Sequence, residues 1–154
     1  MLRTAVLGAV LVTAGAAHAA DDEIYYGSRA GMSVTTVSKE GVGTSNALIR
    51  VEHRPRNAKS YCVDYELDNS MACVRRTMAS VKVRDRVTGD CRKRTWTDLN
   101  GDRFAFLGPQ KNSESMADFV VKRVDTGEVL DGSSASGYPT ALSIFKVLCP
   151  GIAK

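Results

Sequence analysis

The sequence predicts an α+β domain. An antiparallel β-sheet of hairpins is packed by one internal helical segment and one C-terminal helix, with the helices on one face and with disulfides as cross-links. Short segments with alternating apolar residues are separated by turn residues, which is typical of hairpins. Two other stretches repeat apolar residues at helical spacing. Strand and helix patterns do not alternate along the chain, so a parallel sheet of βαβ units is not expected.

The segment Met1–Ala19 has the features of a signal peptide. Arg3 supplies one positive charge, and Ala5–Gly15 consists of apolar and small residues. The stretch that ends at Ala19 has the small-x-small pattern that signal peptidase cleaves. We predict cleavage after Ala19, with Ala20 as the near alternative. An uncleaved membrane anchor is less favoured, because the stretch is short for a membrane span.

Residues 20–154 are expected to form a single exported α+β domain that is periplasmic or secreted. No later stretch reaches the roughly 18 consecutive apolar residues of a transmembrane helix, so no membrane span is expected. The whole chain has 21 basic and 17 acidic side chains, and Arg3 is the one charged side chain that cleavage after Ala19 removes. The net charge of the remaining chain is therefore only mildly positive.

The first predicted hairpin follows a short lead over Asp21–Gly31. Met32–Lys39 is rich in valine and threonine, and Asn46–Arg54 alternates apolar and polar residues. Gly41 to Gly43 supply the loop between these two strands.

The internal helical segment begins at Pro55, a residue typical of the first turn of a helix. Apolar residues recur at helical spacing over residues 57–67 and, more weakly, over 70–79. The intervening Asp68-Asn69-Ser70 predicts a break, at which Asn69 or Ser70 caps the second piece. That second piece could alternatively be an extended approach to the next strand.

The central feature of the prediction is a hairpin over Val81–Trp96. Alternating valines indicate the first strand, and Thr88-Gly89 is expected to form a two-residue turn. This register sets Asp85 opposite Arg92, a favourable cross-strand pair. A three-residue loop is the alternative, and it would move Cys91 onto the valine face.

The C-terminal part predicts three more strands and the clearest helix. The strands are expected at Arg103–Leu107, Met116–Val124 and Glu128–Asp131, with turns at Asn100-Gly101 and Asp125-Thr126-Gly127. A flexible loop over Gly132–Gly137 leads into the helix. Its apolar stripe comprises Tyr138, Ala141, Leu142, Phe145, Leu148 and Cys149, and Pro150-Gly151 ends it.

The four cysteines are expected to form two disulfides, because an even number of cysteines in an exported chain is typical of a disulfide framework. Cys62, Cys73, Cys91 and Cys149 lie far apart along the chain, so they do not form the close C-x-x-C pairs of a metal site. Three pairings are possible. We favour Cys62–Cys73, which requires the two helical pieces to fold back on each other, together with Cys91–Cys149.

No catalytic, metal or cofactor site is predicted. His53 is the one histidine after cleavage, and a serine nucleophile in the Gly132–Gly137 loop would need it as a base. His53 lies at the end of a predicted strand and adjoins Arg54, which is a poor setting for a base that titrates near neutral pH. A small periplasmic hydrolase that uses His53 is therefore only an alternative.

The basic run over residues 75–94 is the feature with the most functional weight, with eight basic and two acidic side chains. One face of the predicted hairpin carries Lys82, Arg84, Arg86 and Lys93, a candidate surface for an anion or a partner protein. The alternative is a solvated sheet face whose charges discourage edge pairing. Nucleic acid is not expected as a partner, because no exposed aromatic residues interleave with these charges.

The sequence therefore favours a small, non-catalytic binding or structural domain. Its expected partner is an anionic component of the cell envelope or a protein that contacts the basic hairpin. A periplasmic enzyme inhibitor is a further alternative, since disulfide-linked domains are rigid platforms for binding.

Overall fold

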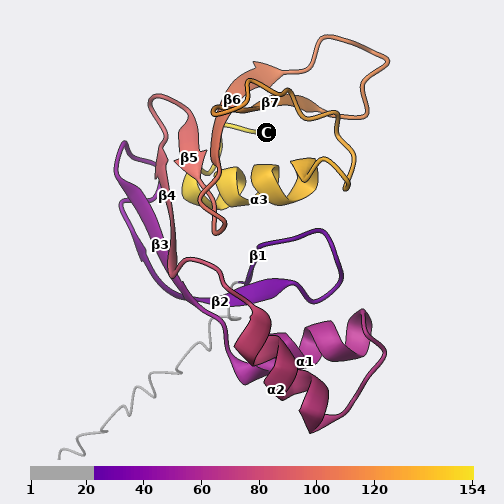
Figure 1. The fold of residues 1–154 in the computed structure, drawn as a ribbon. Helices are drawn as coiled ribbons and strands as arrows, with labels where there is room; N and C mark the ends of the chain where they lie inside the picture. Colours follow the sequence, from indigo (N-terminus) through magenta and orange to yellow (C-terminus); the bar gives the residue numbers. More distant parts are fainter. Residues whose placement is uncertain (1–22) are drawn as a thin grey trace, which may run out of the picture.

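A computed structural model describes residues 23–154, so the predicted signal peptide lies outside the described residues. The fold is α+β, with one seven-stranded antiparallel sheet, three helices and two disulfides, as the sequence predicts. The strands are neighbours in chain order, and the helical pair interrupts the series between the third and fourth strands (Figure 1). The elements are β1 (Glu23–Tyr25), β2 (Ser33–Glu40), β3 (Ala47–Glu52), α1 (Pro55–Asp64), α2 (Met71–Ser80), β4 (Arg86–Asp90), β5 (Thr95–Thr97), β6 (Arg103–Pro109), β7 (Phe119–Arg123) and α3 (Tyr138–Leu148).

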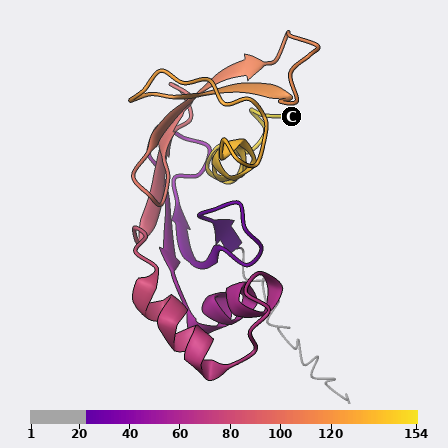
Figure 2. The same cartoon turned by 45° about the vertical axis from the view of Figure 1, so that its right-hand side comes forward.

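The sheet curls around α3. Figures 1 and 2 show β6 and β7 above this helix, β3 to β5 beside it, and β1 and β2 below it. The register shifts between Thr36 and Ser38 in β2 and between Phe106 and Gly108 in β6. Such bulges bend and twist a strand, so they help to explain the curl.

The main core lies between α3 and the concave face of the sheet. The predicted apolar stripe of α3 is buried, and Ile144 is buried as well. A helix that is covered on several sides needs a wider apolar surface than one that packs on a flat sheet, which accounts for Ile144. Phe145 contacts the rings of Trp96 and Phe106, with centroids 4.8 Å away in each case.

Helix α1 lies on the opposite face of the sheet from α3, and α2 packs against α1, so the expectation that the helices share one face of the sheet is wrong (Figure 2). Val34 of β2 belongs to the core around α3, whereas its neighbours Ser33 and Thr35 point the other way. Thr35 and Ser33 are within hydrogen-bond distance of Asn57 in α1, at 3.1 and 3.4 Å. Helix α1 therefore covers the convex side of β2 through polar contacts. The pattern of apolar residues in the sequence does not predict such contacts.

The central hairpin exists, but its predicted turn is wrong. Thr88 and Gly89 lie within β4, and the turn comprises residues 91–94, so neither predicted loop length is correct. Asp90 accepts hydrogen bonds from the backbone N–H groups of Arg92 and Lys93 at 3.0 Å, and this stabilises the observed turn. A Cβ atom at Gly89 would lie 3.3 Å from Leu148, so glycine allows α3 to approach the strand closely.

Candidate functional site

A hollow of about 530 Å³ lies at the centre of the sheet. Its floor includes the cross-strand row Leu48, Thr88, Thr97 and Arg103, in which each residue is opposite the next. These side chains face away from α3, because the alternating residues Gly89 and Trp96 face it. We name this feature the outer hollow.

Three threonine hydroxyls are available in the outer hollow. Thr88, Thr95 and Thr97 are partly exposed, and none of them makes a side-chain hydrogen bond within the described part of the chain. A hydroxyl group both donates and accepts hydrogen bonds, so the floor of the hollow suits a hydroxyl-rich or amide-rich ligand. The sequence reasoning missed these residues because the predicted register placed Thr88 in a turn.

The four predicted basic residues fall into two groups. Lys82, Arg84 and Arg86 alternate along the extended segment that leads into β4, and all three are exposed or partly exposed. Lys93 lies in the turn at the other end of β4, roughly 13 Å from the start of that strand at the rise of a β-strand. The hairpin therefore separates the predicted set, and the outer hollow lies between the two groups.

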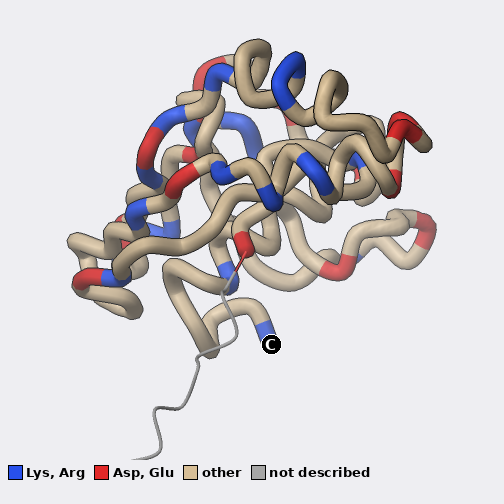
Figure 3. The backbone as a smooth tube through the Cα atoms, turned by 90° about the horizontal axis from the view of Figure 1, so that it is seen from below, with Lys and Arg blue, Asp and Glu red and all other residues tan. Residues whose placement is uncertain are grey.

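Two of these four cations are already paired with neighbouring acids. Arg86 donates to both oxygens of Asp85, at 2.8 and 2.9 Å, and these hydrogen bonds hold the pKa of Asp85 below its usual value. Lys93 lies 3.7 Å from Asp90. Lys82 and Arg84 make no ion pair within residues 23–154. Figure 3 shows basic and acidic residues interspersed along the backbone.

The turn after β4 contributes two further cations. Arg92 and Arg94 are exposed, and neither makes an ion pair with a described residue. The cations available to an outside anion are thus Lys82 and Arg84 at one end of the outer hollow and Arg92 and Arg94 at the other. This arrangement differs from the predicted continuous basic face.

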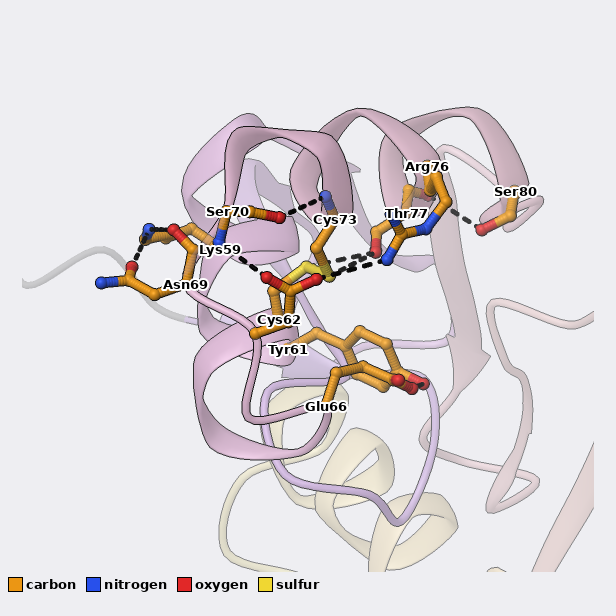
Figure 4. Close-up of a disulfide and its surroundings, with 11 residues drawn as sticks. Lys59, Tyr61, Cys62, Glu66, Asn69, Ser70, Cys73, Arg76, Thr77 and Ser80 are labelled. Carbon is orange, nitrogen blue, oxygen red and sulfur yellow. Dashed lines mark hydrogen bonds and ion pairs between the residues drawn. A yellow bond between two sulfur atoms is a disulfide. The ribbon is translucent and has the colours of Figure 1, made fainter.

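Both predicted disulfides are present. Cys91–Cys149 joins the end of β4 to the end of α3, across a sequence separation of 58. Cys62–Cys73 joins α1 to α2 within a small cluster that also contains Ala58 and Val74. Figure 4 shows this second disulfide beneath the loop that links the two helices. No described cysteine is free, so no thiol is available for chemistry within residues 23–154.

The loop beyond this disulfide, residues 65–70, is a second candidate site, and we name it the helical tip. Its backbone is tied to α1 by a hydrogen bond of 2.8 Å from the Asp68 N–H to the Cys62 carbonyl. Leu67 in this loop is 87% exposed. Leu67 is not among the residues predicted to bind a partner, although the sequence does place one leucine among acidic residues in a loop between two cysteines.

His53 has no catalytic partner in the described structure. Its ring packs edge-on against Tyr26, with centroids 6.0 Å apart, and its buried Nε2 makes no hydrogen bond. Burial lowers the pKa of this imidazole, which favours the neutral form. The hydroxyls of Ser133 and Ser136 in the Gly132–Gly137 loop make hydrogen bonds within the loop, and Ser136 also accepts the N–H of Tyr138 at the start of α3.

A polar hollow of about 230 Å³ near the start of α3 is lined by Asp98, Asn100, Asp102 and Arg123, among others. Asp98 is buried, and burial raises its pKa. Its Oδ1 accepts hydrogen bonds from the backbone N–H groups of Asn100 and Asp102, at 2.9 Å each, so this carboxylate organises the turn before β6. No group of three or more potential metal ligands is assembled within residues 23–154.

Comparison with protein-family models, with curated proteins and with solved structures finds no match to this chain. Among the described residues, no helix has the length and apolar character needed to span a bilayer.

Proposed function

We propose that this protein is an exported, non-catalytic binding domain that holds an anionic polysaccharide of the cell envelope along the outer hollow. The observation that carries the proposal is the hollow itself, which has free threonine hydroxyls on its floor and unpaired cations beyond both ends. Sugar hydroxyls would bond to Thr88, Thr95 and Thr97. Carboxylate, sulfate or phosphate groups farther along the polymer would contact Arg84 and Arg94.

The separation of the two groups of cations favours a polymer over a small anion. A single carboxylate or phosphate cannot contact Arg84 and Arg94 together, because the length of β4 lies between them. An extended chain with repeated charges can contact both ends and fill the hollow between them. The Cys91–Cys149 disulfide holds the turn against α3, so little order would have to be gained on binding.

Export is part of the proposal. Two disulfides within the described residues are typical of an oxidising compartment, and the signal-peptide pattern of Met1–Ala19 agrees with it. We infer a periplasmic or secreted location. Mass analysis of the protein from its native host would test this, since a precursor that retains Met1–Ala19 with four free thiols would contradict it.

Binding to dextran sulfate and to uncharged dextran tests the proposed ligand class. We expect the wild type to bind dextran sulfate more tightly, with an affinity that falls as salt rises from about 50 to about 300 mM, because salt screens the contacts to exposed cations. The double variant Arg84→Glu/Arg94→Glu, with one change at each end of the hollow, should bind at least tenfold more weakly.

The matched control is Lys111→Glu/Lys154→Glu, which changes the net charge equally at exposed sites away from the hollow. We expect it to bind almost as well as the wild type. Equal losses in both double variants would mean that only the overall charge matters, and this would reject the outer hollow as the site. Thr88→Val and Thr97→Val should weaken binding further without changing its salt dependence.

An enzyme inhibitor is the second candidate function, and one observation favours it. The helical tip presents the exposed Leu67 on a disulfide-linked support, as a segment that enters a partner's pocket would require. The hydrolase alternative has less support, because Nε2 of His53 contacts no nucleophile. An activity screen in which His53→Ala behaves like the wild type would dispose of the hydrolase alternative.

A further inference from the structure

Leu67 is both exposed and strained. Its side chain is 87% exposed, and its backbone has a φ of +54°, in the left-handed region. A residue with a branched side chain rarely adopts this conformation, and glycine is the usual residue where a helix ends in it. Leu67 lies just past the end of α1, so glycine would fit this position with less strain and without exposing an apolar side chain.

The exposure of Leu67 is not a consequence of a loose loop. Each of its neighbours in the helical tip is fixed by a specific contact. The Tyr61 hydroxyl donates to Glu66 at 2.8 Å, the Ser70 N–H donates to Asp68 at 2.8 Å, and Lys59 donates to the Asn69 carbonyl at 2.8 Å. Figure 4 shows these pairs on both sides of the Cys62–Cys73 bridge.

Strain that persists in a well-fixed loop is typical of a functional position. The surrounding contacts hold the backbone in one shape, and that shape presents Leu67 to the outside. We propose that Leu67 is the anchor of an interaction surface, the helical tip, that inserts into an apolar socket on a partner protein. This surface is distinct from the outer hollow, and it does not depend on the proposed polysaccharide binding.

The charges around Leu67 indicate the chemistry of the partner. Asp64, Glu66 and Asp68 lie within three residues of it, with no basic residue between them. Hydrogen bonds from Ser70 and the Arg76 guanidinium hold the pKa of Asp68 below its usual value. Asp68 is already paired with Arg76 at 3.4 Å. Asp64 and Glu66 make no ion pair with a described residue, so they are the acids that a partner would meet. The socket should therefore be apolar at its centre and bordered by lysine or arginine side chains.

A lipid surface fits these features less well than a protein. One leucine buries little apolar area in a bilayer, and adjacent carboxylates are repelled by anionic headgroups. A pocket in a protein can surround a single side chain completely, and such buried anchors dominate binding at many interfaces. The rigid tip also requires little ordering when it binds, which favours insertion as a preformed unit.

Site-specific photo-crosslinking in the native host tests this proposal. A diazirine-bearing amino acid replaces Leu67 in the full chain, and the same amino acid replaces Leu107 as a control. Leu107 lies in β6 and is 57% exposed, so it reports on apolar exposure alone. We expect the amino acid at position 67 to crosslink to another protein. The crosslinked peptide should line an apolar pocket, and basic residues should border that pocket. We expect no such adduct from position 107.

Adducts with lipid only, adducts with a second copy of this chain only, or equal yields at positions 67 and 107 would each overturn the proposal. Once that partner is identified, its affinity for two variants provides a quantitative test. Leu67→Gly should bind at least tenfold more weakly with no fall in melting temperature, because glycine relieves the strain. Asp64→Lys should bind several-fold more weakly, whereas wild-type affinity in Leu67→Gly would reject Leu67 as the anchor.

Discussion

Thr35 in β2 donates a hydrogen bond from Oγ1 to Oδ1 of Asn57 in α1, over 3.1 Å, and both residues are fully buried. The same Oδ1 accepts the Arg54 N–H at 3.0 Å, and Nδ2 of Asn57 lies 3.3 Å from Glu23 in β1. One side chain therefore joins the start of α1 to two strands. The contacts between α1 and this part of the sheet are polar. The stability that they contribute therefore depends on hydrogen-bond geometry more than on the apolar area that is buried.

Asn57→Ala should destabilise the protein by about 2–3 kcal/mol, because the change leaves the buried O–H of Thr35 without its acceptor. Urea unfolding measures this difference. Asp64→Ala is the matched control on the same helix, since Asp64 is exposed, and its effect should stay within about 0.5 kcal/mol. A similarly small effect of Asn57→Ala would show that the network contributes little to the attachment of α1.

Gly31 allows the loop between β1 and β2 to lie directly on α1. Its φ is +73°, and a Cβ atom there would overlap the backbone of Ser60 and Tyr61. Gly43 has a similar φ of +82° but open space around it. Gly43→Ala should therefore cost only the conformational strain, about 1–2 kcal/mol. Gly31→Ala should cost about 3 kcal/mol or more, because the backbone of a helix cannot move aside easily. Equal melting temperatures for the two variants would contradict this close approach.

The helices and cross-links could be predicted from the sequence, because local patterns determine them. The apolar stripe of α3 and the break before Ser70 are periodic or capping signals, and Ser70 does accept the Cys73 N–H at 3.2 Å. Once two short helices are expected to fold back, Cys62–Cys73 is the favoured one of the three possible pairings. The second pair, Cys91–Cys149, then follows by elimination.

The arrangement of the candidate sites could not be predicted, because it depends on contacts that are distant in sequence. The sequence predicts Gly89 as a turn residue, whereas in the structure Gly89 lies in β4 and allows Leu148 of α3 to approach closely. The observed turn comprises residues 91–94, later in the chain than predicted. Arg86 and Lys93 therefore lie at opposite ends of β4 and not on one face of a hairpin. The position of α1 on the convex face depends on Asn57, one polar residue whose partners in the sheet lie more than 20 positions away.

The two disulfides should contribute unequally to stability. Replacing Cys91 and Cys149 by alanine opens a loop of 58 residues and should cost about 4 kcal/mol, whereas replacing Cys62 and Cys73 opens a loop of 11 residues and should cost about 3 kcal/mol. Chemical unfolding of both double variants measures the difference. The Cys62/Cys73 variant should also bind the protein partner of the helical tip more weakly than the wild type does, and it should bind dextran sulfate as tightly as the wild type. Weaker binding to dextran sulfate with unchanged binding to the partner would contradict the assignment of the two surfaces.

The half-buried imidazole of His53 should make stability depend on pH near neutrality. Burial lowers its pKa in the folded state, while in the unfolded state its pKa is close to the ordinary value of about 6.5. Below about pH 6.5 the unfolded chain therefore binds more protons at this position than the folded chain does. Stability from this residue is fully present about one pH unit above 6.5, and it is lost as the pH falls through 6.5 toward the lowered pKa of the folded state.

His53→Phe keeps an aromatic ring against Tyr26 and removes the titrating group, so it isolates this effect. Urea unfolding of both proteins between pH 5 and pH 8 measures it, since the carboxylates contribute equally to both and cancel in the difference. We expect the free energy of unfolding of the wild type to fall relative to His53→Phe as the pH drops below 6.5, and the difference to be constant above pH 7.5. A constant difference over the whole range would mean that the imidazole is solvated in the folded state, and a rise at low pH would mean that it gains an acidic partner.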